Sequence, residues 1–173
     1  FVPNHVARDY GKTTFTEGHP VLGEEDDKTV HWKAENDFFY YVGERLVLPT
    51  PVPEGMAPYE EMPAMATGNN CYSPTPGIND WYETVKINYG DEHTATWDRM
   101  YDIIEFWMGE GVDGFRCDMV ELVPPQFFKW LIETVKKEYP SLIFGNTKDS
   151  IKRLIKVDFP VLTGPTTPIY ISP

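Results

Sequence analysis

Residues 114–118, Gly-Phe-Arg-Cys-Asp, include side chains whose types and spacing are suited to catalysis. In an extended strand alternate side chains share a face, so Arg116 and Asp118 are expected on one face and Cys117 on the other. An arginine at this spacing favours the ionised form of the carboxylate. An ionised carboxylate at the carboxyl end of a parallel strand can act as a nucleophile. An ordinary ion pair at the end of a strand explains the same spacing.

A second pair, Asn4-His5, follows an apolar start and lies near the end of a predicted strand over residues 1–6. An amide and an imidazole in such a place can direct a metal ligand and a hydrogen-bond donor into one cleft. A simple turn explains the pair as well. Neither pair identifies a site by itself, because a site also depends on the helices and strands that position these side chains.

The composition limits the class of ligand. The 173 residues include 27 Asp and Glu against 15 Lys and Arg, which gives a formal net charge of −12. Such a chain is a poor partner for nucleic-acid phosphates, and it suits a neutral or cationic ligand such as a sugar or a metal ion. Apolar residues form 41% of the chain, which is typical of a globular protein. No apolar run approaches the ~20 residues that a membrane-spanning helix requires.

Residues 92–145 are predicted to alternate helices and strands. Apolar residues at helical spacing predict a first helix within 91–109, with Asp91, Glu92 and Thr94 as candidate starts and Gly109 or Gly111 as its stop. A second helix is expected after the Pro-Pro pair at 124–125. Apolar stretches at 111–119 and 141–145 predict two short strands. This order is typical of a parallel α/β unit, which would place the Arg-Cys-Asp run at the end of a strand.

Residues 8–91 have a different character. Proline and glycine recur throughout this stretch, so regular helices are not expected. The stretch is too long for a structureless loop in a compact domain, so we interpret it as a small aromatic-lined subdomain. The acidic run at 24–27 is interpreted as a solvated turn, because it lacks the alternation of an EF-hand. Flat rings that could stack on sugars, although core packing explains most of them, are Trp32, Phe38, Phe39, Tyr40, Tyr41, Trp81 and Tyr82.

Taken together, these pieces resemble the α-amylase family of glycoside hydrolases. Residues 1–6 are similar to the family's first motif, which ends in Asn-His, and residues 114–118 to its second motif, Gly-Phe-Arg-x-Asp. Residues 77–90 resemble the end of the family's inserted domain. The order and spacing of the pieces agree with the family over residues 1–144.

The resemblance implies an α/β fold that forms part of a (β/α)₈ barrel, the TIM barrel, with an irregular inserted domain after the third strand. Residues 1–7 would then be the end of barrel strand 3, 8–91 the inserted aromatic and Pro-rich subdomain, and 92–145 a barrel α/β segment. Residues 146–173 form a tail of unassigned character. A complete barrel takes about 200–250 residues, so this chain is too short to form one.

The resemblance also implies roles for four residues. Asp118 matches the catalytic nucleophile, and Arg116 matches the arginine that orients it. His5 matches a histidine that binds the sugar at the point of cleavage. Asn4 matches an asparagine that ligates a structural calcium ion in many members, and oxygen ligands of this kind suit Ca²⁺.

The proton donor has no assigned residue. Retaining glycoside hydrolysis needs a second carboxyl group about 5–5.5 Å from the nucleophile. Where the family carries that glutamate the sequence has Thr147, and a threonine is a poor proton donor near neutral pH. Glu121 is the nearest following carboxylate to Asp118, but a loop position so close in sequence is a poor match. The acid/base residue therefore stays unknown.

The expected function is retaining hydrolysis of α-1,4-glucosidic bonds in starch or malto-oligosaccharides. The alternative is an inactive or incomplete fragment that at most binds glucan. Neither nucleic acid nor a membrane is expected as a partner, and self-association would cover the open edges of a partial barrel. Because polymeric starch is met outside the cell, the resemblance implies an extracellular or periplasmic location.

Overall fold

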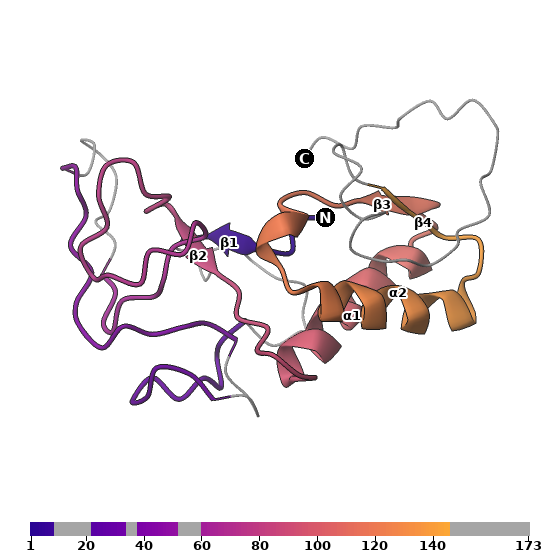
Figure 1. Ribbon diagram of the computed structural model, residues 1–173, viewed down its shortest axis with the longest axis horizontal. Coiled ribbons are helices and arrows are strands. Elements are labelled where there is room, and N and C mark those ends of the chain that lie inside the picture. The colour runs from indigo at the N-terminus through magenta and orange to yellow at the C-terminus, as the bar shows by residue number, and fades with distance from the viewer. Residues whose placement is uncertain (9–21, 34–37, 52–59, 146–173) are drawn as a thin grey trace.

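The computed structural model describes residues 1–8, 22–33, 38–51 and 60–145. In order, its elements are β1 (His5–Ala7), β2 (Thr84–Lys86), α1 (Ala95–Gly109), β3 (Gly114–Arg116), the short 3₁₀ helix η2 (Val120–Leu122), α2 (Pro125–Glu138) and β4 (Ile143–Gly145). β1 and β2 lie between an irregular part and a part that carries both α-helices (Figure 1). No helix in these residues has the length and apolar character needed to cross a membrane.

Three segments run parallel beside one another. β3 and β4 pair in parallel with Gly114 opposite Ile143, and a Cβ on Gly114 would lie only 2.4 Å from the carbonyl oxygen of Ile143. On the other side of β3, the amino group of Phe1 donates to the carbonyl of Arg116 at 2.8 Å. The N–H of Asp118 in turn donates to the carbonyl of Phe1 at 3.0 Å. This is the hydrogen-bond pattern of a parallel pair, so the start of the chain extends the sheet.

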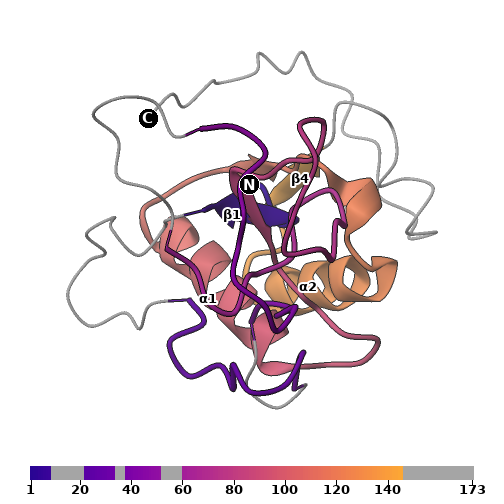
Figure 2. The ribbon, with the colours of Figure 1, turned by 90° about the vertical axis from the view of Figure 1, so that its left-hand side faces the viewer.

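α1 and α2 pack on one side of these strands (Figures 1 and 2). Trp97 of α1 meets Phe127 of α2 with ring centroids 5.7 Å apart, and Tyr89 lies 4.4 Å from Phe127. The hydroxyl of Tyr89 donates to the carbonyl of Pro3 at 2.6 Å, which ties this core to the start of the chain. The apolar faces predicted from helical spacing are confirmed; the buried residues are Thr96, Trp97, Met100, Ile104 and Met108 in α1, and Phe127, Phe128, Leu131, Ile132 and Val135 in α2.

The ends of α1 follow local chemistry. Thr94, one of the three candidate starting residues, is the N-cap, and the helix begins at Ala95. The hydroxyl of Thr94 caps no helical N–H and donates instead to the carbonyl of Tyr89 at 3.2 Å. At the other end Gly111 has φ +88°, and its N–H donates to the carbonyl of Met108 at 2.9 Å. Glycine adopts this left-handed conformation without strain, so the predicted stop is confirmed.

The acidic run at 24–27 is more than a solvated turn. The carboxylate of Asp26 accepts hydrogen bonds from the N–H of Phe38 at 2.8 Å, the N–H of Phe39 at 2.9 Å and the hydroxyl of Tyr41 at 3.0 Å. The interpretation of the run as purely solvated is therefore wrong for Asp26. This side chain orders an aromatic segment, and the fully buried Phe39 ring joins the core.

The antiparallel pair β1–β2 brings the two ends of segment 8–91 side by side, with His5 opposite Lys86. One parallel strand–helix–strand unit with one added parallel segment is too little to establish a barrel. The (β/α)₈ assignment and the domain boundaries therefore stay predictions. Residues 146–173, including Thr147, lie outside the described residues.

Candidate functional site

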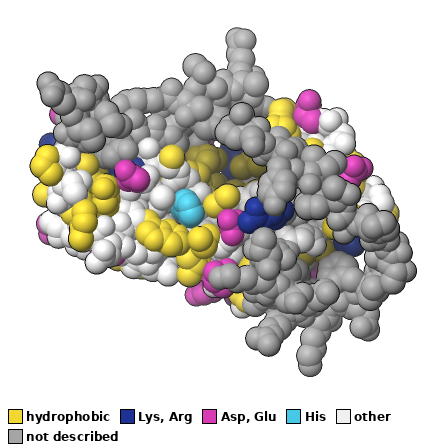
Figure 3. Space-filling model, turned by 90° about the horizontal axis from the view of Figure 1, so that it is seen from above, with side chains coloured by type: hydrophobic (Ala, Val, Ile, Leu, Met, Phe, Trp, Pro, Cys, Tyr) yellow, Lys and Arg dark blue, Asp and Glu magenta, His cyan; other side chains and the backbone are white. Residues whose placement is uncertain are grey.

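His5 and Asp118 are brought together by the two sheets. Asp118 follows β3 directly, and its backbone bonds to Phe1, four positions before His5. The negative charge of Asp118 also acts on the His5 ring. Burial lowers the pKa of His5 below its usual 6.5, the negative charge of Asp118 opposes this shift, and the positive charge of Lys86 adds to it. Figure 3 shows one histidine near the middle of a face, with acidic and basic side chains beside it and hydrophobic ones around it.

Asn4 fixes the orientation of the His5 ring. Asn4 is 1% exposed, and its Nδ2 donates to the carbonyl of Gly68 at 2.7 Å and lies 3.1 Å from Nδ1 of His5. Because an amide nitrogen can only donate, Nδ1 of His5 must accept. The lowered pKa and this hydrogen bond both favour the neutral ring with its proton on Nε2. An Nε2–H of this kind can donate to a sugar hydroxyl.

Asp118 lies in an open position. Its Oδ2 is 4.0 Å from Nη2 of Arg116, at the outer limit of an ion pair, and the two side chains are 48% and 59% exposed. The N–H of Met119 donates to Oδ1 at 3.1 Å, and Met119 has a left-handed φ of +52°. Cys117 between them is fully buried. The predicted alternation of faces is confirmed, and one carboxylate oxygen stays free of backbone hydrogen bonds within the described residues.

Trp81 forms a wall beside His5. The two rings meet edge to face with centroids 5.6 Å apart. Gly68 makes room for this arrangement, since a Cβ there would lie 2.9 Å from Cβ of His5 and 2.7 Å from Oγ1 of Thr84. Of the aromatic residues considered for sugar stacking, Trp81 is the one that contacts His5 among the described ring pairs. Trp81 is half-buried, and its contact with a sugar stays a prediction.

Lys86 is the site residue that sequence reasoning missed. It is the cross-strand partner of His5, and burial lowers the pKa of its ammonium group. The resemblance covers residues 77–90, but the register of β1 against β2 joins positions about 80 residues apart in the sequence. Only the alternation Thr-Val-Lys at 84–86, which puts the lysine on the face opposite the fully buried Val85, hinted at its place.

The described residues offer one candidate calcium ligand, and the proton donor has no assigned residue. Oδ1 of Asn4 is buried without a hydrogen-bond partner in the described part of the chain, so it fits one ligand of a calcium ion. The same residues contain no group of three or more His, Cys, Asp or Glu that could hold a metal, whereas Ca²⁺ takes about six to eight oxygens. Glu121 is exposed in η2. The acid/base residue stays unassigned.

Comparison with known proteins gives partial matches to one kind of enzyme. No family model matches the chain. It is 28% identical over 130 residues to an α-1,4-glucan:maltose-1-phosphate maltosyltransferase of Mycolicibacterium smegmatis, which covers 73% of this chain and 18% of that enzyme. The same kind of enzyme from Mycobacterium tuberculosis is 27% identical over 131 residues, 73% of this chain and 18% of its own. That of Corynebacterium glutamicum is 29% identical over 80 residues, 46% of this chain and 12% of its own.

The chain thus spans less than a fifth of the length of these curated relatives. All three relatives are named as glucan-active glycosyl transferring enzymes. They support the resemblance to the α-amylase family at the level of the family, and they do not support hydrolysis in particular. The roles of His5, Asn4, Arg116 and Asp118 stay predictions with the geometry given above.

Proposed function

We propose that this chain carries part of the active site of a glucan-active enzyme of α-amylase type, in which Asp118 is the nucleophile. The placement of Asp118 relative to His5 supports this proposal most directly: Asp118 follows a parallel strand and bonds to the backbone of Phe1, and its charge acts on the His5 ring more than 110 positions away in the sequence. Active sites of parallel α/β folds lie at such strand ends. The relatives support a glucan as the substrate.

In the proposed reaction the Asp118 carboxylate attacks the anomeric carbon, and the bond to the leaving oxygen breaks. Arg116 lies beside the carboxylate, with its Nη2 4.0 Å from Oδ2 of Asp118, while Nε2–H of His5 donates to a hydroxyl of the same sugar. Trp81 offers a flat face beside it. A neutral glucan leaving group also needs a proton from an acid that has no assigned residue. Water then releases the sugar, with net retention of configuration.

The test is reducing-sugar release from soluble starch by the purified protein and its Asp118→Asn variant. We expect the substitution to lower the rate at least about 1,000-fold, because the nucleophile is lost. Asp102→Asn is the matched control, since Asp102 is an exposed aspartate on α1 that pairs only with Arg99 in the described residues. Equal rates for Asp118→Asn and the unmodified protein would rule out the nucleophile. Glucan binding without any release would leave a binding fragment as the account.

Transfer to another glucan is the second candidate, because the relatives are named maltosyltransferases. It shares the first half of the reaction and differs in the acceptor, which is a sugar hydroxyl in place of water. Product analysis separates the two candidates. Hydrolysis gives only shorter oligosaccharides from maltoheptaose, whereas transfer also gives longer ones.

The remaining parts of the proposal rest on the resemblance. They are a partial TIM barrel, self-association over its open edges, an extracellular or periplasmic location, and a structural calcium ion on Asn4. The orphaned Oδ1 of Asn4 supports the calcium ion. Adding Ca²⁺ to chelator-treated protein should raise the melting temperature, and an unchanged melting temperature would contradict a structural calcium site on Asn4.

A further inference from the structure

Met119, the residue that follows Asp118, has a left-handed backbone. Its φ is +52° and its ψ is +32°, a region that glycine enters freely and that other residues avoid because their Cβ is crowded there. Strained backbone of this kind persists only where the surrounding structure enforces it, and it clusters at functional sites. Met119 lies between the candidate nucleophile and η2, so its conformation decides how the chain leaves the site.

The chain before Met119 is fixed by the segments on both sides of β3. The N–H of Cys117 donates to the carbonyl of Gly145 at 2.8 Å, and the N–H of Asp118 donates to the carbonyl of Phe1 at 3.0 Å. Cys117 is also fully buried. The backbone up to Asp118 therefore cannot turn without breaking the sheet.

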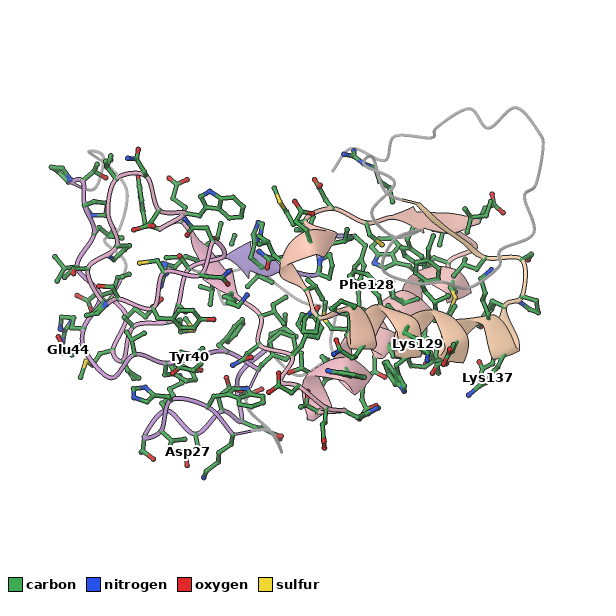
Figure 4. All side chains as sticks on the ribbon, in the orientation of Figure 1. Asp27, Tyr40, Glu44, Phe128, Lys129 and Lys137 are labelled. Carbon is green, nitrogen blue, oxygen red and sulfur yellow. The ribbon has the colours of Figure 1, made fainter. Side chains whose placement is uncertain are left out.

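The chain after Met119 is fixed as well. The N–H of Leu122 donates to the carbonyl of Met119 at 3.1 Å, and Val120 at the start of η2 is fully buried. Phe128 of α2 belongs to the same core cluster as Val120 and points from its helix toward the strands, whereas Lys137 points away (Figure 4). With both sides held, Met119 has to make the turn from β3 into η2 alone.

The left-handed turn keeps the backbone N–H of Met119 beside the Asp118 carboxylate. The N–H donates to Oδ1 at 3.1 Å, and within the described residues no other hydrogen bond reaches this carboxylate. Nη2 of Arg116 lies nearer the other oxygen, 4.0 Å from Oδ2. If Met119 took an ordinary right-handed or extended φ while both neighbours stayed in place, the peptide group between Asp118 and Met119 would have to rotate. The N–H would then leave Oδ1.

We propose that Met119 is a positioning residue, whose backbone N–H fixes Oδ1 of Asp118 so that Oδ2 is the oxygen that attacks the anomeric carbon. This inference rests on the proposed function, because it acts through the same nucleophile. Oδ2 forms a bond to the anomeric carbon, the bond to the leaving group breaks, and its electron pair departs with the leaving group. A carboxylate already held in this orientation needs no rotation before the attack. The role belongs to the backbone, and the methionine side chain takes no part.

An ester in place of one amide tests the N–H and leaves the carboxylate unchanged. The α-hydroxy analogue of methionine at position 119 removes the N–H and keeps the side chain. The matched control is the same replacement at Tyr139, whose N–H donates to the carbonyl of Val135 at 2.9 Å at the end of α2. The substrate is α-maltosyl fluoride, because fluoride leaves with little help from an acid. Fluoride release gives kcat/KM, inhibition by maltose measures binding of the sugar, and melting temperatures show whether each variant is folded.

We expect the ester at Met119 to lower kcat/KM about 10-fold, the lower end of the range for a hydrogen bond to a charged group. The lower end applies because the Asp118 side chain is 48% exposed and water reaches it. The inhibition constant of maltose should stay within about twofold, since the N–H contacts the carboxylate and not the sugar. The ester at Tyr139 should change neither quantity by more than about twofold. An unchanged kcat/KM at Met119, or equal losses at both positions, would overturn the inference.

Substitutions of Met119 test the left-handed conformation. Glycine and asparagine adopt it most readily, and β-branched valine adopts it least. We expect Met119→Gly and Met119→Asn to keep kcat/KM within about threefold and Met119→Val to lose about 10-fold or more. Met119→Gly should also melt above Met119→Ala, because alanine is strained at this φ. Higher activity for Met119→Val than for Met119→Asn would assign the role to the apolar side chain and overturn the inference, and so would a higher melting temperature for Met119→Ala.

Asp118→Asn in the same assay separates this inference from the proposed function. Loss of fluoride release in Asp118→Asn together with full activity of the ester at Met119 would overturn only this inference and leave Asp118 as the nucleophile. Fluoride release by Asp118→Asn at the rate of the unmodified protein would overturn both. Absence of release by the unmodified protein would also overturn both.

Discussion

Arg8 joins the two ends of segment 8–91 through a network of hydrogen bonds. Its side chain is 1% exposed, and Nε donates to the carbonyl of Tyr82 at 2.7 Å. Nη2 donates to the carbonyls of Met65 at 3.2 Å and Thr84 at 3.1 Å, and Nη1 pairs with the carboxylate of Glu61. Arg8 therefore joins the chain leaving β1 to the segments that carry β2 and Trp81.

Replacing Arg8 with methionine keeps much of the apolar stem and removes every one of these donors. The carboxylate of Glu61, whose side chain is 12% exposed, then loses its cation in a largely dry place. Removing one partner of a buried ion pair costs about 3–5 kcal/mol of unfolding free energy. In a domain of this size each kcal/mol lowers the melting temperature by about 2–4 °C. We therefore expect Arg8→Met to melt about 6–20 °C below the unmodified protein.

Thermal unfolding followed by circular dichroism measures this change. Arg45→Met is the matched control, because Arg45 is exposed and the substitution changes charge and shape in the same way. An exposed substitution of this kind should change the unfolding free energy by less than about 0.5 kcal/mol. Replacing Glu61 with methionine as well should recover part of the loss, since no charge then stays unpaired. Equal melting temperatures for Arg8→Met and Arg45→Met would refute the role given to Arg8.

Three further predictions concern the surroundings of the site. Gly68→Ala should cost about 1–3 kcal/mol in urea unfolding, because its Cβ would lie 2.9 Å from Cβ of His5; unchanged stability would contradict the close packing. The His5 ring should titrate below 6.5 in an NMR pH series, and Asp118→Asn should lower that midpoint further, because the negative charge that raises the pKa of His5 is lost. An unchanged midpoint would contradict an effect of Asp118 on the His5 ring. Tyr89→Phe should cost about 1–3 kcal/mol of stability, because the carbonyl of Pro3 loses its buried hydrogen bond; equal urea midpoints would contradict this.

The lowered pKa of His5 also fixes the sign of a pH effect on stability. The folded state disfavours protonation of this ring, so its contribution to stability is complete above 6.5, the unfolded value. That contribution is lost as the pH falls from 6.5 through the lower folded pKa. The NMR midpoint described above therefore also marks the lower end of this window.

Local patterns were enough to predict the helical part of the molecule. The spacing of Trp97, Met100, Ile104 and Met108 gave the buried face of α1, and the alternation around Cys117 gave the exposed faces next to it. These features depend on the spacing of apolar residues within one element, so neighbouring residues in the sequence are enough to predict them. The same patterns offered three starting residues for α1, and the structure has the last of them, Thr94, at the N-cap.

The features that long-range contacts decide could not be predicted. Lys86 lies opposite His5, and Gly68 lies close to the same residue. Both features depend on how segment 8–91 brings its distant parts back to β1. The use of Asp26 as an acceptor for three groups likewise depends on a segment more than ten residues away. Each of these residues, considered alone in the sequence, fits a solvated loop or turn.

Covalent trapping tests the central claim, that Asp118 is a nucleophile, most directly. A 5-fluoro-α-maltosyl fluoride carries a leaving group that needs little acid assistance, and its ring fluorine slows breakdown of a glycosyl ester. The reagent therefore tests Asp118 independently of the unassigned proton donor. We expect the intact mass to rise by one glycosyl group, with the label on the peptide that contains Asp118, and no label on Asp118→Asn. A label on a different residue, or fluoride release that Asp118→Asn leaves unchanged, would contradict the account.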